Sequence, residues 1–155
     1  SIPFMQKRTR TPCVGICSTT YGDEVCRGCK RFYFEVINWN KYDEDEKEAI
    51  WTRLESLKTQ IIYSKIKKIN SKKLSTKIAE LDLKIKTDLN EFCQIFDLIK
   101  LVSESFEDLS DFGITFHDKS MNLEILKRDL EEELLALSDA HYSKYFKDPL
   151  EQKKA

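Results

Sequence analysis

The sequence contains few of the residues that build turns, sheets and conventional catalytic sites. Its 155 residues include 4 Gly, 3 Pro and 2 His, whereas 34% of them are charged. Scarce glycine and proline leave little material for the many tight turns of an all-β domain, so the composition favours long helices. A length typical of one domain also argues against a large enzyme with separate cofactor and substrate domains.

Several signals of location and catalysis are also missing. No uninterrupted apolar run reaches the length of a membrane span, and residues 1–10 lack the apolar stretch of a secretory signal. The chain has no phosphate-binding glycine loop and no H-E-x-x-H motif, and His117 and His141 lie in no recognisable nucleophile–base motif. We therefore expect a soluble, cytoplasmic protein that is not an enzyme, with no membrane partner and no evident small-molecule substrate.

Cysteine, in contrast, is concentrated near the start of the chain. Cys13, Cys17, Cys26 and Cys29 have the spacing C-x3-C-x8-C-x2-C. Two thiolates three or four residues apart reach one ion from a single tight turn, and two such turns complete a tetrahedron. In a reducing compartment this pattern favours one metal centre over a pair of disulfides. Zinc is the favoured occupant of such a closed site, and an iron–sulfur cluster is the alternative.

The same residues carry a resemblance to a known family. Its pattern comprises Pro12-Cys13-x-Gly15-x-Cys17, Cys26-Arg27-Gly28-Cys29, Arg31, Glu35, Asn38-Trp39-Asn40-Lys41 and Glu46-Lys47. Over about residues 11–57, this stretch resembles domain of unknown function 1289, a family of small bacterial proteins labelled as predicted iron–sulfur proteins. The resemblance implies four metal ligands, at Cys13, Cys17, Cys26 and Cys29, and a bacterial cytoplasmic setting. It implies no reaction.

The rest of the chain predicts amphipathic helices, over about residues 43–69, 72–102 and 119–146. Asp43 and Glu46 form a capping pair for the first helix, and Ser71 is a candidate cap for the second. Apolar residues from Leu74 to Ile99 alternate by three and four, the spacing of a coiled-coil seam, and Cys93 falls among them as a small core residue.

These elements predict a mainly α protein in two parts. Residues 1–42 form a four-cysteine metal-binding head covered by an aromatic lid that begins at Phe32, and residues 43–155 form a helical extension. Long amphipathic helices cannot bury their apolar faces alone, so we expect an antiparallel hairpin or bundle, or a seam presented to another chain.

Charge is segregated along the sequence. Residues 58–77 contain seven lysines and no acid, whereas residues 80–139 contain 16 acidic and six basic residues. Seven like charges in so short a stretch repel one another unless the protein's own acids, nucleic acid or an acidic partner lie close by. The candidate partner-binding cations are Arg8, Arg10, Arg27, Lys30 and Arg31 in the head and Lys67, Lys68, Lys72 and Lys73 in the extension.

The function that these features favour is that of a non-catalytic binding module. A metal-stabilised head and a helical arm dock on a protein or ribonucleoprotein assembly, with a protein as the favoured partner. Two alternatives remain open: a zinc protein that binds RNA or DNA through its basic residues, and an iron–sulfur protein for electron transfer or redox sensing.

The cysteine pattern makes a direct prediction. Replacing Cys13, Cys17, Cys26 or Cys29 by Ser is expected to abolish stoichiometric metal, because each supplies one of four ligands, whereas Cys93→Ser is expected to retain it. Metal analysis of the five purified variants measures this. Equal metal in the parent and in Cys17→Ser would contradict a four-ligand site.

Overall fold

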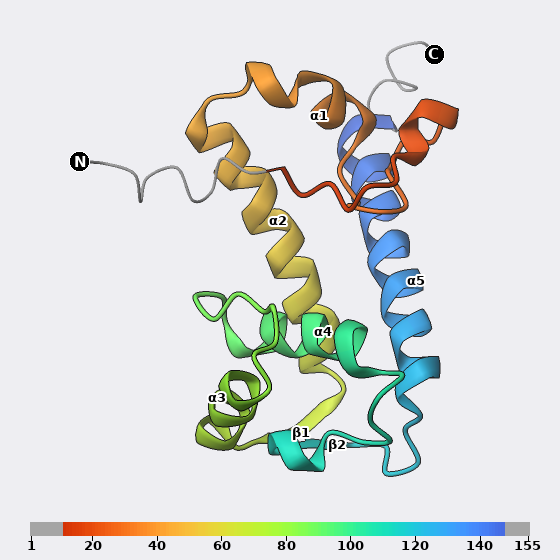
Figure 1. Cartoon of the computed structure of the whole chain (residues 1–155). Coiled ribbons are helices and arrows are strands. Elements are labelled where there is room, and N and C mark those ends of the chain that lie inside the picture. The colour runs from red at the N-terminus through yellow and green to blue at the C-terminus, as the bar shows by residue number, and fades with distance from the viewer. Residues whose placement is uncertain (1–10, 148–155) are drawn as a thin grey trace, which may run out of the picture. The chain divides into compact units, whose positions relative to one another are not determined.

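The computed structural model describes residues 11–147, and they are mainly helical, as the sequence predicts (Figure 1). Within this described part, no helix is both long and apolar enough to cross a bilayer. In chain order the elements are the short helix η2 (Ser18–Tyr21), α1 (Tyr33–Asn38), the short helix η3 (Trp39–Lys41), α2 (Glu44–Tyr63), β1 (Ile66–Ile69), α3 (Ser71–Glu80), α4 (Glu91–Val102), the short helix η4 (Ser110–Phe112), β2 (Ile114–Phe116), α5 (Leu123–Tyr142) and the π-helical turn η5 (Ser143–Lys147).

The described residues form two compact units. The first unit comprises residues 11–57 and 134–147, and the second comprises residues 58–133. The division therefore differs from the predicted boundary between residues 42 and 43. The start of α2 belongs with the head because Ile50 and Leu54 are buried in one apolar cluster with Trp39.

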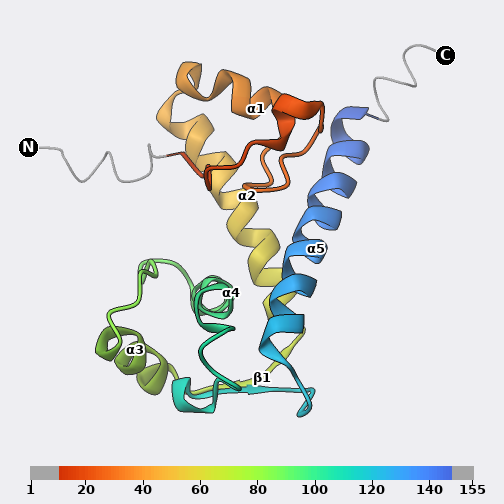
Figure 2. The same ribbon diagram turned by 45° about the vertical axis from the view of Figure 1, so that its right-hand side comes forward.

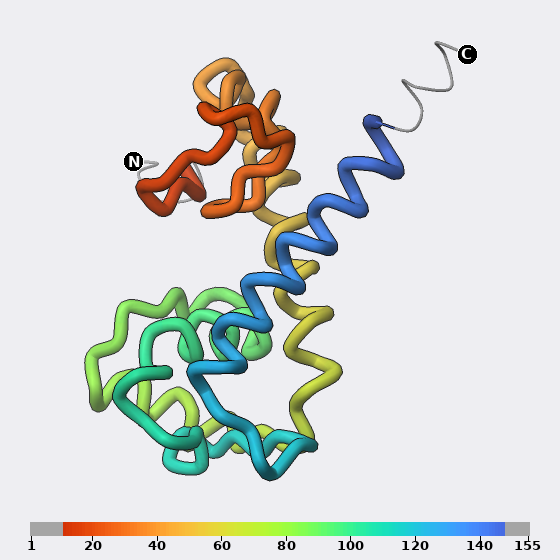
Figure 3. The backbone as a smooth tube through the Cα atoms, turned by 90° about the vertical axis from the view of Figure 1, so that its right-hand side faces the viewer, coloured from red at the N-terminus to blue at the C-terminus, as the bar shows by residue number. Residues whose placement is uncertain are grey.

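The first unit holds a second apolar cluster, which is centred on Phe32. Val25, Phe32 and Tyr142 are buried together, and the ring centroids of Phe32 and Tyr142 are 5.4 Å apart. Residues 11–31 reach this cluster through short loops rather than long elements (Figure 3). Part of the predicted aromatic lid, including Phe32, is therefore buried in the core of the first unit, whereas Ile37 of α1 is 70% exposed.

A buried ion pair joins α1 to α2 in the first unit. The Arg53 guanidinium donates to both carboxylate oxygens of Glu35, at 2.6 and 2.7 Å. Glu35 also accepts a hydrogen bond from the backbone N–H of Phe32 at 2.8 Å, and Arg53 lies 4.1 Å from the centre of the Phe32 ring. One bidentate pair therefore fixes the start of α1, the position of α2 and one face of the central aromatic ring.

The second unit contains a two-stranded antiparallel sheet with α3 and α4 (Figure 2). Ile69 pairs with Ile114, and the backbone N–H of Asn70 donates to the carbonyl of Gly113 at 2.8 Å. Gly113 has φ +75°, and a Cβ on it would lie 2.8 Å from the Cβ of Asn70. This close approach explains why glycine occupies the turn before β2.

Two predicted helices are wrong in extent. Residues 66–69 form a strand instead of the end of a helix that runs to residue 69, because they pair with Ile114–Phe116, a partner distant in sequence. Residues 72–102 are not one helix: α3 ends at Glu80, Asp82 has φ +51°, and α4 begins at Glu91. The continuous coiled-coil seam through this region is therefore wrong as well.

The helix caps account for most of the remaining boundaries. The Asp43–Glu46 capping pair is confirmed by two reciprocal hydrogen bonds, at 2.8 and 3.2 Å. The cap of α3 is Asn70 rather than Ser71, because the Asn70 side chain accepts from the Lys73 N–H at 3.1 Å. The last helix begins at Leu123, later than the predicted residue 119, and the Asn122 side chain accepts from the Ile125 N–H at 3.0 Å.

Buried apolar residues spaced by three and four line one face of the last helix. Leu123, Leu126, Leu130 and Leu134 of α5 are buried, and α5 ends at Tyr142, where the π-helical turn follows. Cys93 is fully buried on α4, which confirms its place in the core.

The Arg53–Glu35 pair is expected to be essential for the stability of the first unit. Arg53→Met leaves the buried Glu35 carboxylate without its partner, so the free energy of unfolding should fall by about 3–5 kcal/mol. Both tryptophans, Trp39 and Trp51, lie in this unit, so their fluorescence during urea unfolding reports on it. The double variant Glu35→Leu/Arg53→Met should be less destabilised than Arg53→Met, and the reverse order would contradict the assignment.

Candidate metal centre in the cysteine head

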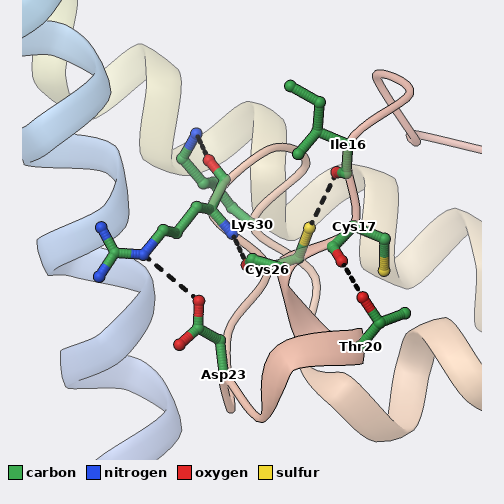
Figure 4. A network of polar contacts seen from close by, with 8 residues as sticks. Ile16, Cys17, Thr20, Asp23, Cys26 and Lys30 are labelled. Atoms are coloured by element: carbon green, nitrogen blue, oxygen red, sulfur yellow. Dashed lines mark hydrogen bonds and ion pairs between the residues drawn. The ribbon is translucent and has the colours of Figure 1, made fainter.

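The two cysteine-bearing turns of the head pack against each other. A Cβ on Gly28 would lie 2.7 Å from the Ile16 carbonyl oxygen and 2.8 Å from the Val14 side chain, so only glycine permits this approach. The Arg27 N–H donates to the Ser18 hydroxyl at 2.8 Å, and the Cys26 thiol lies 3.6 Å from the Ile16 carbonyl (Figure 4). The local fold thus brings residues 13–18 against residues 26–29.

Cys26 and Cys29 have surroundings suited to thiolates. Burial acts to raise the pKa of Cys26, but hydrogen bonds from the backbone N–H groups of Cys29, Ser18 and Gly28, and from the Cys29 thiol, lower this pKa to about 7. Burial raises the pKa of Cys29, although the Arg31 Nε donates to its sulfur at 3.2 Å and opposes this rise. N–H groups and a guanidinium directed at sulfur stabilise the charge of metal-bound cysteine.

Cys13 and Cys17 are near this pair but are arranged differently. The Gly15 N–H donates to the Cys13 sulfur at 3.4 Å, and the Cys17 sulfur lies 2.9 Å from the Thr19 hydroxyl. Figure 4 shows the thiols of Cys17 and Cys26 pointing in different directions. Among residues 11–147, no group of three or more histidine, cysteine, aspartate or glutamate side chains is placed to hold one ion. The structure therefore brings the two turns together without converging all four thiols.

The candidate cations of the head have different environments. Arg27 is exposed and pairs with Asp23 at 3.3 Å. Lys30, by contrast, is 2% exposed, and its ammonium donates to the Arg27 and Gly28 carbonyls at 2.6 and 3.0 Å. Arg31 is 3% exposed and lies 5.0 Å from the centre of the Trp39 ring. Burial makes Lys30 and Arg31 internal counter-charges of the head rather than surface cations. Arg8 and Arg10 lie outside the described residues.

The remaining candidate cations belong to the second unit. Lys67 and Lys68 lie on β1, and Lys72 and Lys73 lie in the first turn of α3, all four exposed. Asn70 is the single residue between β1 and α3, so the two pairs of lysines lie near each other in the sequence.

Sequence reasoning missed a surface of the head that the fold creates. A groove of about 570 Å³, here called the head groove, has a largely apolar lining. Its lining residues are Cys17, Thr19, Thr20, Gly22, Asp23, Glu24, Tyr33, Val36, Ile37 and Tyr142. Tyr142 follows Ile37 by more than a hundred residues, so no local sequence pattern links the two sides of the groove. The run of apolar and aromatic residues from Phe32 to Trp39 was the one available signal in the sequence.

The fold and the cysteine turns define a helical protein with a four-cysteine head. Residues 11–58 match the family model described as protein of unknown function (DUF1289), which confirms the resemblance predicted for residues 11–57. This match covers about a third of the chain. No curated protein and no solved structure matches the chain.

The donor types of the head suit a four-cysteine metal centre, although its four thiols do not converge in this structure. Hydrogen bonds already stabilise sulfur at Cys13, Cys26 and Cys29, and Gly28 keeps the two turns in contact. Cys13, Cys17, Cys26 and Cys29 are the residues that would hold a metal here, and the ion would link two loops that have few apolar contacts of their own.

The buried Lys30 side chain is expected to hold the second cysteine turn closed. Lys30→Met keeps the length of the side chain but leaves the Arg27 and Gly28 carbonyls without its ammonium, so the free energy of unfolding should fall by about 1–3 kcal/mol. Urea unfolding followed by tryptophan fluorescence measures this loss. The exposed Lys41→Met is the matched control, with an expected change within about 0.5 kcal/mol. Equal stability of the two variants would contradict the structural role of Lys30.

Proposed function

We propose that this protein is a non-catalytic, metal-stabilised docking module that binds a protein partner through the head groove. The observation that carries this proposal is a largely apolar groove that lies open beside the cysteine turns. A cytoplasmic setting forms part of the proposal.

The surface around the head groove has the composition of a binding site. Tyr33 and Ile37 are 41% and 70% exposed, and Tyr142 closes the opposite side from the end of α5. Exposed aliphatic and aromatic side chains that surround a concave surface mark sites where a partner buries apolar area. Tyr21, at 88% exposure, precedes Gly22 of the groove lining and adds apolar surface next to it.

The charges beside the head groove indicate the chemistry of the partner. Asp23 and Glu24 line the groove, and Asp139 joins them in an adjacent hollow. Burial raises the pKa of the Asp139 carboxyl, and the negative charges of Asp23 and Glu24 raise it further, although Arg27 opposes this. Asp23 pairs with Arg27 at 3.3 Å and Glu24 with Lys147 at 3.6 Å, whereas Asp139 makes no ion pair within the described residues. A partner segment that places an apolar side chain in the groove and a lysine or arginine beside Asp139 would supply the missing positive charge.

The metal in this proposal has a structural role. Zinc is the favoured occupant, because four cysteines would leave no open coordination position for a substrate. A metal at the cysteine turns would fix the loop that contributes Cys17, Thr19 and Gly22 to the groove. Partner binding would then depend on metal through the shape of the head.

Electron transfer by an iron–sulfur cluster is the second candidate. The N–H groups on the Cys26 sulfur and the guanidinium on the Cys29 sulfur are the kind of hydrogen bonds that tune cluster potentials. Absorption of the anaerobically purified protein distinguishes the two candidates, because an iron–sulfur cluster is coloured and zinc is not.

The docking proposal predicts that a charge in the groove abolishes partner binding. Ile37→Asp removes apolar contact area and places a carboxylate among Tyr33, Val36 and Tyr142. The apolar side chain of the partner would bury this carboxylate without a hydrogen-bond partner, so the complex should weaken at least tenfold. The measurement is affinity purification from native cells, followed by reconstitution of the recovered partner at 1:1 stoichiometry in high salt.

A matched control separates the groove from general surface effects. Ile125→Asp changes the same residue type at 50% exposure on α5 in the second unit, and it should bind the partner as the parent does. Equal binding by Ile37→Asp and the parent would overturn the groove as the docking site.

A further inference from the structure

The second unit divides its seven clustered lysines into two sets. Three of them pair with acids of this unit: Lys58 with Asp97 at 3.2 Å, Lys65 with Glu133 at 2.9 Å, and Lys77 with Glu80 at 3.9 Å. The other four, Lys67, Lys68, Lys72 and Lys73, make no ion pair with any residue in the described range and are exposed. The acids of residues 11–147 therefore leave one short basic segment without ion pairs. These four residues are called the lysine face below.

A β-bulge exposes both lysines of the strand. In a regular strand, adjacent side chains point to opposite faces, so one of Lys67 and Lys68 would be directed to the interior. The register instead shifts between Ile66 and Lys68, so that Ile66 pairs with Phe116 and Lys68 with Thr115. Lys67 is the extra residue of this bulge, and Ile66 stays buried while both lysines face solvent.

The two lysines of the helix lie where the local electrostatics disfavour them. Lys72 and Lys73 are in the first turn of α3, at the positive end of the helix dipole, and this turn contains no acidic residue. They border a hollow of about 570 Å³ with Asn70, Thr76 and Lys77. Glu80 and Asp111 border it too, but neither lies within ion-pair distance of Lys72 or Lys73. Uncompensated cations at such a position favour an external anion.

The lysine face has the composition of a phosphate-binding surface rather than a protein interface. Ile66, Leu74 and Ile78 are buried, so the exposed surface between residues 66 and 78 consists of lysine, hydroxyl and amide side chains. Protein interfaces have an apolar core, whereas contacts to a nucleic-acid backbone are polar and strongly basic. The lysine face contains no aromatic residue that could stack on an unpaired base. Tyr63, which precedes it in the chain and is exposed, already packs edge-on against Phe92 with ring centroids 5.5 Å apart, and this favours a duplex over a single strand.

From these observations we infer that the lysine face binds the phosphate backbone of a nucleic-acid duplex without sequence preference. Lys67 and Lys68 contact phosphates from the bulged strand, and Lys72 and Lys73 contact them from the start of α3. This surface is independent of the proposed function, because it lies in the second unit and shares no residue with the head groove.

The test compares DNA binding by the parent and a quadruple variant. A fluorescent 20-base-pair duplex of mixed sequence is titrated with protein at several salt concentrations. Changing Lys67, Lys68, Lys72 and Lys73 to Gln should weaken binding at least tenfold at low salt. The slope of log affinity against log salt should flatten by roughly one unit for each lysine that contacts a phosphate.

The control variant removes the same charge elsewhere. The control variant replaces four exposed cations by Gln: Lys41, Lys84, Arg128 and Lys144. It loses the same net charge as the quadruple variant of the lysine face, but it should bind the duplex much more tightly than that variant. Circular dichroism verifies that both proteins remain folded. Ile37→Asp should bind the duplex as the parent does, so failure of the groove proposal and failure of this inference give different results.

Four results would overturn the inference. They are absence of binding by the parent at low salt, equal weakening by the two quadruple variants, equal or tighter binding to a single strand of the same length, and displacement of the duplex by polyglutamate at equal charge concentration. Titration with a duplex RNA of the same length shows which of the two duplexes the lysine face prefers.

Discussion

The buried pair of Arg53 and Glu35 is the interaction on which the first unit depends. The Glu35 carboxylate accepts two hydrogen bonds from Arg53 and one from the backbone N–H of Phe32. It therefore connects the start of α1, the side of α2 and the ring at the centre of one apolar cluster. A small head with few large apolar residues depends on such directional contacts for its geometry, because its apolar area alone is modest.

Two cations of the head are buried, whereas the four of the lysine face in the second unit are exposed to solvent. Lys30 and Arg31 are turned inward, where they bind carbonyl oxygens and the Cys29 sulfur. Lys67 and Lys68 are turned outward by a bulge that keeps Ile66 in the core. Residue type alone does not distinguish these cases, since a buried lysine and an exposed one carry the same charge. Burial, hydrogen-bond partners and nearby acids separate structural cations from those free to meet a ligand.

Several features of the fold followed from local patterns. Scarce glycine and proline and the Asp43–Glu46 capping pair predicted helices that the structure contains, because composition and caps act locally along the chain. The break at residues 81–90 was missed since the apolar spacing continued through it. The strand at Ile66–Ile69 was missed because its partner, Ile114–Phe116, lies more than forty residues away.

For the candidate site, the sequence by itself determined the four cysteines, their spacing and the family resemblance, all of which are properties of neighbouring residues. Only the tertiary structure decided that Gly28 lets the cysteine turns meet, that Lys30 and Arg31 are internal, and that Tyr142 completes a groove with Ile37. The physical reason is that burial and charge compensation depend on neighbours in space. Contacts such as Phe32 with Tyr142 join residues that no local periodicity relates.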